Sequence, residues 1–284
     1  MRIAVLASNS FIGKNLIENL KNIRDGKNRT RPDLSISDIN EDKVEDADMV
    51  IILPGAEIEQ KIEGDVIYIA SFIPSEDEVK VIDTLPEEAL IYRLPEIIGK
   101  WEKPDEGVIA GLCYAVANDE EYEVSNHDDM LEILFIDDFV TEILDALEGH
   151  PHRCNFPAAG EPSSDPTAQY DGKTPVPDTN WKYCYSPQII RTTVESVIKL
   201  LESFNQMNTT LIVPEMPADS LAYKLFSMYL SYLPERKMSY PVKMSMDNRG
   251  VFTELVKTRN NGQVSINIAR PNNVRGQHWH NNKW

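Results

Sequence analysis

Two histidines near the end of the sequence, His278 and His280, have a spacing that can place two imidazoles on one metal ion. Alternate residues of a strand point to the same face, so a His-x-His pair in a strand presents both rings together. Zinc is the metal expected, but a catalytic zinc usually has about three protein ligands. No histidine or carboxylate side chain follows the pair before Trp284. The pair therefore predicts either part of a zinc site or a terminal segment that binds no metal.

The loop from Ala7 to Gly13 is a second candidate, because it joins an apolar stretch to a helical one. Dinucleotide-binding folds have glycines here for a tight turn, for close approach of pyrophosphate and for helix packing. Only the last of these, Gly13, is present, although Ser10 can cap a helix whose N-terminus favours an anion. The alternative is a structural turn that holds no nucleotide. The predicted cofactor contacts are Asn9, Ser10, Phe11, Ile12 and Gly13, with Pro54 and Gly55.

Short apolar stretches alternate with helical patterns in the first hundred residues, and they indicate what positions this loop. Strands are expected at 2–6, 48–53, 65–69 and 89–94, and helices at 11–23 and 58–63. A weaker strand at 34–37 would put Asp38 where a ribose-binding acid follows the second strand. Apolar strands separated by helices are typical of a parallel sheet covered on both faces. The pattern predicts an α/β fold with a Rossmann-like parallel sheet.

The later sequence predicts more helix and a different kind of sheet. Helices are expected at 108–118, 137–147, 188–204 and 221–233, and residues 149–187 are expected to be mainly surface loop. Alternating apolar residues at 251–256 and 264–269, around an Asn-Gly pair, predict an antiparallel hairpin. The predicted domains are residues 1–239, with a partly helical substrate subdomain at about 150–235, and a short β segment at 240–284.

Composition limits the function classes. The 284 residues include 28 basic and 46 acidic side chains, a net charge of -18 that disfavours nucleic acids and anionic membranes. No apolar run reaches the roughly 18 residues that span a bilayer. The three cysteines, an odd number without Cys-x-x-Cys spacing, favour a reducing compartment, and we expect a cytoplasmic protein.

Several longer motifs resemble one family. The motifs are LIYRLPEIIGKWEKP at 90–104, VIAGLCY at 108–114, FIDD at 135–138, ALEG at 146–149, YLSYLP at 229–234, SYP at 239–241, DNRG at 247–250, FTE at 252–254, GQVSIN at 262–267 and HWH at 278–280. With them the sequence resembles extended short-chain dehydrogenase/reductases, and among them the bifunctional capsular-polysaccharide enzymes that epimerise and reduce a UDP-2-acetamido-2,6-dideoxy-hexos-4-ulose on the route to UDP-N-acetyl-L-fucosamine. The C-terminal motifs are similar to that family's interdomain segment and to the start of its cupin domain.

The resemblance implies ligands, partners and contacts. It implies NAD or NADP as cofactor, a UDP-sugar as substrate, zinc in the cupin and a homodimer. Arg93, Lys100 and Trp101 fall in the segment that holds the UDP-sugar, where cations and an indole suit a diphosphate and a base. The alternative is that Arg93 forms an ion pair and that Trp101 belongs to the core.

The sequence departs from the family at the catalytic residues. The resemblance implies a Tyr-x-x-x-Lys pair in a helix after the strand that ends near Ile69, but no tyrosine lies between Ile69 and Leu90. The family's catalytic serine corresponds to Ser71 or to Phe72. One hypothesis is a reductase/epimerase that uses Tyr114 or Tyr92 as its acid. The other is a catalytically inactive binding or scaffold protein that keeps a nucleotide-sugar pocket but has lost hydride chemistry.

Overall fold

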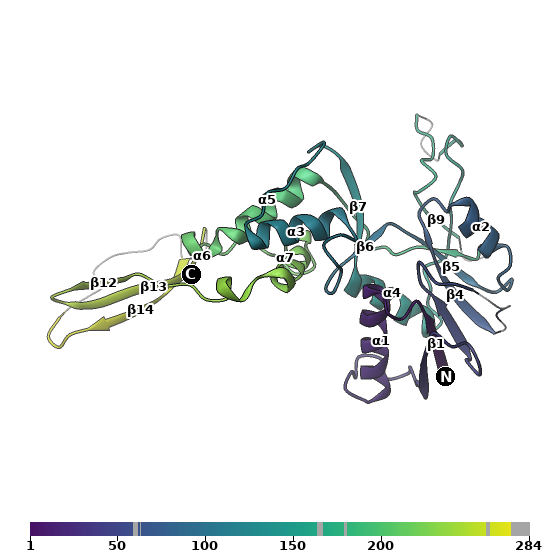
Figure 1. Cartoon of the computed structure of the whole chain (residues 1–284), viewed down its shortest axis with the longest axis horizontal. Coiled ribbons are helices and arrows are strands. Elements are labelled where there is room, and N and C mark those ends of the chain that lie inside the picture. The colour runs from purple at the N-terminus through teal and green to yellow at the C-terminus, as the bar shows by residue number, and fades with distance from the viewer. Residues whose placement is uncertain (59–61, 63, 164–166, 179–180, 260–261, 274–284) are drawn as a thin grey trace. The chain divides into compact units, whose positions relative to one another are not determined.

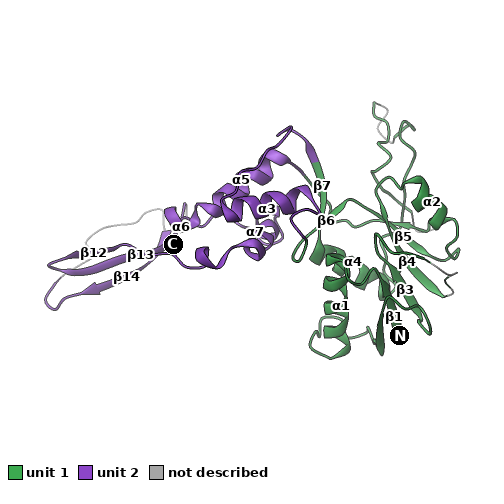
Figure 2. Ribbon diagram, in the orientation of Figure 1, with its two compact units in different colours: residues 1–102, 131–191 green, residues 103–130, 192–284 purple. Residues whose placement is uncertain are grey.

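The computed structural model describes residues 1–58, 62, 64–163, 167–178, 181–259 and 262–273, and Figure 1 labels many of its helices and strands. The chain divides into two units, which Figure 2 colours separately. Unit 1 comprises Met1–Glu102 and Leu131–Arg191, and unit 2 comprises Lys103–Met130 and Thr192–Trp284. The predicted domain boundary near residue 240 and the substrate subdomain remain predictions.

Unit 1 is organised around a six-stranded sheet with the order β10-β5-β4-β3-β1-β2. All neighbouring strands in it run parallel, which confirms the predicted Rossmann-like sheet. Its strands are β1 (Arg2–Leu6), β2 (Asp38–Glu41), β3 (Met49–Ile52), β4 (Asp65–Ser71), β5 (Leu90–Leu94) and β10 (Tyr183–Cys184).

The second strand lies later than predicted. Leu34 and Ile36 are buried, but the ladder with β1 begins where Asp38 pairs with Arg2 and ends where Glu41 pairs with Val5. The apolar residues thus pack just ahead of the strand and do not form it. Asp38 opens β2, and Asp42 is the acidic residue that follows it.

Both faces of the sheet are buried, as expected for parallel strands between covering layers. Alternate side chains of the strands form one apolar cluster that includes Ile82 from α2 (Glu76–Ile82). The residues between them, such as Ile3, Ile51 and Ile67, point to the opposite face and are equally buried. The helix α1 (Phe11–Arg24) contacts α4 (Ile136–Leu147).

The other elements of unit 1 are short. The strands β6 (Glu96–Ile98) and β7 (Met130–Phe135) pair in parallel, and β8 (Cys154–Asn155) pairs antiparallel with β9 (Val176–Pro177). Between residues 149 and 187 the described strands have two residues each, which confirms that this region is mainly loop. The predicted helix at 58–63 lies largely outside the described residues.

Unit 2 begins with helices in which α3 contacts both α5 and α7. The helix predicted at 188–204 starts later than expected, because Ile190–Thr193 forms the strand β11 and the Thr193 hydroxyl caps α5 through the Ser196 amide. β-Branched residues favour the extended backbone there. The helices are α3 (Val108–Asn118), α5 (Val194–Asn205), α6 (Met207–Thr210), α7 (Leu221–Tyr232) and the 3-10 turn η1 (Glu235–Lys237).

An antiparallel sheet, β12-β13-β14, completes unit 2. It consists of β12 (Met244–Asp247), β13 (Gly250–Thr258) and β14 (Gly262–Ala269), so the predicted hairpin is confirmed. The centre of the predicted Asn-Gly turn, residues 260–261, lies outside the described residues.

Candidate functional site

A pocket of about 450 Å³ lies at the carboxyl ends of β3, β4 and β5, and we call it the strand-end pocket. Small ligands of open α/β sheets bind at this end of the strands. The lining residues come from the start of α1, from the strand ends and from the loop before β9. They are Ile12, Pro54, Ile69, Ala70, Ser71, Phe72, Ile73, Leu94, Pro95, Glu96, Ile97 and Lys173.

Two of the polar side chains in this lining have firm partners. Ser71 at the end of β4 donates both its amide and its hydroxyl to Glu78 Oε1, at 2.9 and 3.0 Å. Removal of water tends to raise the pKa of Glu78, but the bonds from Ser71 and Ser75 together lower it below its usual value. Lys173 Nζ lies 3.1 Å from Glu132 Oε2. The serine and the lysine are therefore both held by carboxylates.

Glu96, the first residue of β6, differs from them. Its side chain is accessible to solvent, and within the described part of the chain its carboxylate has neither a hydrogen bond nor an ion pair. The surrounding protein excludes part of its hydration, which raises the pKa of this carboxyl above its ordinary value. The strand-end pocket thus contains a carboxyl group that keeps its proton to a higher pH than a fully solvated one.

The loop between β1 and α1 has the backbone shape that a glycine-rich loop adopts. Ala7 has a φ of 59°, in the left-handed region where glycine is normally found. Ser10 caps α1 by accepting a hydrogen bond from the Gly13 amide at 3.0 Å. A Cβ at Gly13 would lie 2.5 Å from the Ser8 carbonyl oxygen, so a larger residue does not fit there. Asn9, Phe11 and Ile12 lie in the same loop and first helical turn.

A second pocket of about 480 Å³, the β2-side pocket, lies beside this loop and is strongly acidic. Asp42 accepts a 3.0 Å hydrogen bond from the Ser8 amide, which ties the end of β2 to the loop after β1. Asp42, and not Asp38, therefore occupies the position in which an acid follows the second strand. The lining residues are Leu6, Asp42, Lys43, Val44, Glu45, Glu57, Ile58 and Ile62.

Arg93 is held by the protein itself. Its guanidinium donates to the carbonyl oxygen of Phe72, at 2.7 Å from Nε, and to that of Gly172, at 2.8 Å from Nη2. It also lies over the Phe156 ring, 4.1 Å from the centroid, and burial lowers its pKa. Through Phe72 it fixes one wall of the strand-end pocket. Contact with a substrate remains a prediction.

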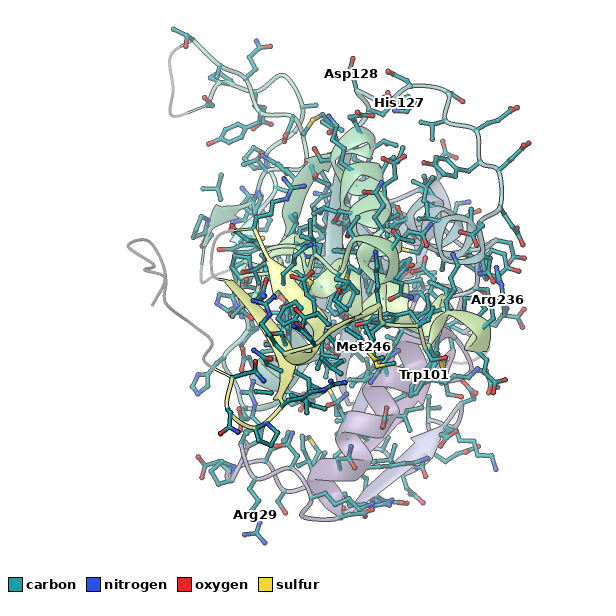
Figure 3. All side chains as sticks on the ribbon, turned by 90° about the vertical axis from the view of Figure 1, so that its left-hand side faces the viewer. Arg29, Trp101, His127, Asp128, Arg236 and Met246 are labelled. Carbon is teal, nitrogen blue, oxygen red and sulfur yellow. The ribbon has the colours of Figure 1, made fainter. Side chains whose placement is uncertain are left out.

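Lys100 and Trp101 lie beside α1. The Lys100 ammonium lies 5.0 Å from the Trp101 ring centroid and 3.6 Å from Glu18 Oε2. Trp101, labelled in Figure 3, is 50% exposed and has a φ of 70°. Because Trp101 is half exposed, it is available to stack on a ligand. Lys100 contacts Glu18, whereas Arg93 contacts the carbonyl groups of Phe72 and Gly172. These described contacts give no sign that the two cations form one basic pocket.

The two tyrosines considered as acids do not line the strand-end pocket. Tyr92 is fully buried and donates its phenol to Glu142 Oε1 at 2.7 Å, and burial with that carboxylate raises its pKa. Tyr114 belongs to α3 of unit 2 and packs edge-on against Tyr232. Neither geometry supports a role in proton transfer in the strand-end pocket.

The predicted metal ligands, His278 and His280, lie outside the described residues. Among the residues that are described, no cluster of His, Cys, Asp and Glu side chains could hold a metal ion. The same part of the chain has no helix that is both long and apolar enough to cross a bilayer.

Comparisons with known proteins agree with the parallel-sheet fold. Residues 245–284 match the model of the polysaccharide biosynthesis C-terminal domain. A Pseudomonas aeruginosa UDP-2-acetamido-2,6-beta-L-arabino-hexul-4-ose reductase is 28% identical over 194 residues, which are 68% of this chain and 45% of the relative. The chain thus spans less than half of that relative's length.

A solved structure covers more of the chain. The capsular polysaccharide assembling protein CapF from Staphylococcus aureus is 27% identical with a TM-score of 0.72, over 99% of this chain and 78% of that one. The chain is thus similar over nearly its whole length to a capsular polysaccharide assembling protein. The UDP-glucose 4-epimerase of Thermus thermophilus, solved with NAD, shares only the fold with this chain, at 10% identity and a TM-score of 0.50 over 84% of this chain and 100% of the epimerase.

Sequence reasoning missed three residues that line the two pockets, Glu96, Lys173 and Asp42. Glu96 directly follows Pro95 at the end of a predicted strand, and that position could have indicated it. Lys173 comes from the long loop, and nothing in its sequence neighbourhood indicates the strand-end pocket. Asp42 was missed because the second strand was placed four residues too early.

Proposed function

We propose that this protein is a nucleotide-sugar reductase/epimerase of surface polysaccharide biosynthesis and that it binds a UDP-2-acetamido-2,6-dideoxy-hexos-4-ulose. The observation that carries the proposal is the strand-end pocket, formed where open α/β sheets bind ligands. The Pseudomonas aeruginosa relative is named as a reductase of such a UDP-hexulose, and CapF as a capsular polysaccharide assembling protein. The first likeness favours this substrate class, and the second favours a role in capsular polysaccharide assembly.

The proposed cofactor is NAD or NADP, bound at the loop after β1. The left-handed backbone at Ala7 and the close packing at Gly13 fit a dinucleotide loop, since both reproduce what glycines do there. Asn9, Ser10, Phe11, Ile12 and Gly13 would hold the pyrophosphate at the N-terminus of α1, with Pro54 and Gly55 opposite. A bound nicotinamide supplies hydride. The chain's own part is to orient it over the strand-end pocket.

The proposed sugar-nucleotide contacts are Lys100 and Trp101, with Arg93 shaping the pocket wall. The exposed indole of Trp101 offers a stacking surface, and Lys100 offers a charge for a phosphate. Arg93 already donates to two carbonyl groups, so its main proposed contribution is to hold Phe72 in place.

A second candidate function is a binding or scaffold protein with the same pocket and no hydride transfer. The observation that favours it is the lining of the strand-end pocket, which contains no tyrosine among the described residues. Its serine hydroxyl is also donated to Glu78. In this candidate function the protein binds the UDP-sugar but does not catalyse its reduction.

Two binding measurements separate these candidates. NADPH is titrated against the protein by fluorescence, and UDP-N-acetyl sugars are tested by thermal shift. The reductase proposal expects both to bind, with oxidation of NADPH on addition of the 4-keto-sugar nucleotide. A shift with UDP-sugars and no binding of NADPH or NADH would leave only the binding protein, and no UDP-sugar binding would reject both.

Three further parts of the proposal concern surroundings and partners. We propose that the protein is cytoplasmic, because a reducing environment would preserve the thiols of its three buried cysteines. We propose a homodimer, which light scattering on the eluting protein would test. Zinc at His278 and His280 is tested by metal analysis of the purified chain and of its H278A/H280A variant.

A further inference from the structure

Ser71, the last residue of β4, lines the strand-end pocket with a hydroxyl group whose proton is already in use. The residue is exposed, and its hydroxyl donates to Glu78 Oε1 at 3.0 Å. Its backbone amide donates to the same oxygen at 2.9 Å. A serine hydroxyl has one proton and two acceptor lone pairs. A ligand group beside Ser71 therefore meets an oxygen that can accept hydrogen bonds but has no proton left to donate.

The charge of Glu78 fixes the direction of this hydrogen bond. The second carboxylate oxygen, Oε2, accepts the Ser75 amide at 2.7 Å within the capping box of α2. Partial burial tends to raise the pKa of Glu78, but the hydrogen bonds from Ser71 and Ser75 together hold that pKa below its usual value. An ionised carboxylate only accepts hydrogen bonds. At neutral pH Ser71 must therefore be the donor of the pair.

The ammonium of Lys173 has the opposite hydrogen-bonding property in the same pocket. It can only donate, and one of its three N–H groups reaches Glu132 Oε2 at 3.1 Å. Apart from Ser71, Lys173 and Glu96, the described lining residues are apolar. A pocket of this kind discriminates between polar ligand groups, because a mismatched group leaves a desolvated donor or acceptor unpaired.

We propose that Ser71 selects a hydrogen-bond donor of the bound sugar, the acetamido N–H or the hydroxyl at C3, and that Glu78 is the positioning residue that imposes this choice. The inference rests on the proposed substrate class and adds to it the polarity of one contact. A keto oxygen at C4 would face a second acceptor beside Ser71, so C4 must lie away from the end of β4. The ammonium of Lys173 suits such an acceptor oxygen of the sugar.

The experiment measures the affinity of the full chain for UDP-N-acetylglucosamine and three analogues by isothermal titration calorimetry. Two analogues have fluorine in place of the hydroxyl at C3 or at C4, and the third has an O-acetyl group in place of the acetamido group. None of these replacements can donate a hydrogen bond. Wild type is expected to bind the C3 or the O-acetyl analogue about 2- to 10-fold more weakly than the parent, the range for one hydrogen bond between neutral groups.

Variants assign this difference to the Ser71–Glu78 pair. Ser71→Ala should bind the parent and that analogue equally. Glu78→Gln should reduce the difference, because a side-chain amide can donate to Ser71 and leave the serine proton for the ligand. Ser75→Ala is the matched control, since it removes a hydroxyl from the same capping box outside the pocket lining and should keep the wild-type difference. Thermal unfolding without ligand shows that each variant is folded.

The possible results separate this inference from the proposed function. Equal binding of the parent and all three analogues by wild type would overturn the inference, as would an undiminished difference in Ser71→Ala or in Glu78→Gln. A difference that depends on Ser71 but arises at C4 would overturn it too, because C4 carries the keto group of the proposed substrate. In each of these cases UDP-sugars still bind and the proposed function stands. Absence of binding by wild type would overturn both.

Discussion

Tyr92 of β5 donates its phenol to Glu142 of α4 at 2.7 Å, and both side chains are buried. The other carboxylate oxygen of Glu142 lies 2.7 Å from His152 Nδ1, and the His152 amide donates to the first oxygen at 3.3 Å. The Tyr92 phenol, the His152 amide and the His152 ring thus surround a carboxylate that is 3% exposed. A buried carboxylate needs this many partners to offset its lost hydration.

Removal of one donor should therefore be costly. We expect Tyr92→Phe to lower the free energy of unfolding by about 1–3 kcal/mol, the usual cost of leaving a buried polar group unsatisfied. Urea denaturation followed by circular dichroism measures this change. Tyr122→Phe is the control, since its phenol bonds to Glu202 at a more exposed site over 3.3 Å, and it should cost less than about 1 kcal/mol. Equal losses in the two variants would contradict the role given to Glu142.

Glu78 should make the stability of the fold depend on pH in the acidic range. Its folded pKa is lowered by the bonds from Ser71 and Ser75, which outweigh its partial desolvation. A lowered folded pKa means that the stabilisation is present above the unfolded pKa and is lost as the pH falls through the folded one. We expect Glu78→Gln to be less stable than wild type at neutral pH and the difference to shrink in acid. Urea midpoints measured from neutral to acidic pH test this, and a gap that stays constant with pH would contradict it.

Replacement of Ala7 by glycine should stabilise the fold. Its φ of 59° costs an L-residue energy that glycine does not lose, so Ala7→Gly should stabilise the fold by up to about 1 kcal/mol. The comparison variant is Ala117→Gly in α3, where the backbone is helical and the side chain is buried, so the same change should destabilise by about 1 kcal/mol or more. Thermal unfolding of the two variants gives the comparison. A destabilised Ala7→Gly variant would show that its Cβ makes a favourable contact.

The Arg93 guanidinium donates hydrogen bonds to two carbonyl groups, and we expect that a lysine at this position cannot form both. Arg93→Lys keeps the charge but loses the planar group that donates to Phe72 and Gly172 and stacks on Phe156. We expect a loss of about 1–3 kcal/mol in unfolding free energy, because two carbonyl groups lose a donor. Lys100→Arg, at an exposed ion pair, is the control and should change stability little. Loss of UDP-sugar affinity in a fully stable Arg93→Lys variant would instead favour direct contact with substrate.

The sequence carried most of the information about the sheet. Apolar strands that lie between two other strands of the sheet, such as Met49–Ile52, could be located from the sequence to within a residue or two. The strand β2 was misplaced because its pairing residues, Asp38–Glu41, are mostly polar, while the apolar Leu34 and Ile36 precede it. A hydrophobic pattern identifies buried residues. Here the buried residues precede the residues that form hydrogen bonds with β1, so the pattern misplaced the strand.

Fewer residues of the candidate site than of the sheet could be predicted from the sequence. The loop from Ala7 to Gly13 could be found because its position between strand and helix is local in sequence. Lys173 joins Ser71 and Glu96 only because a long loop returns to the strand ends, and such a contact leaves no periodic signal. The partners of Arg93 are backbone carbonyls, which sequence patterns do not identify.

The sheet of unit 1 also sets an order of events during synthesis. Its last strand, β10, pairs with β5 through Tyr183 and Ile91, although residues 103–130 of the other unit lie between them in the sequence. Until residues 183–184 leave the ribosome, β5 has an open edge that can pair with another chain. Closing so long a loop costs entropy that local contacts do not offset, so this docking should be late and slow. A nascent chain stopped before Tyr183 would therefore be prone to aggregate, although it already contains every residue that lines the strand-end pocket.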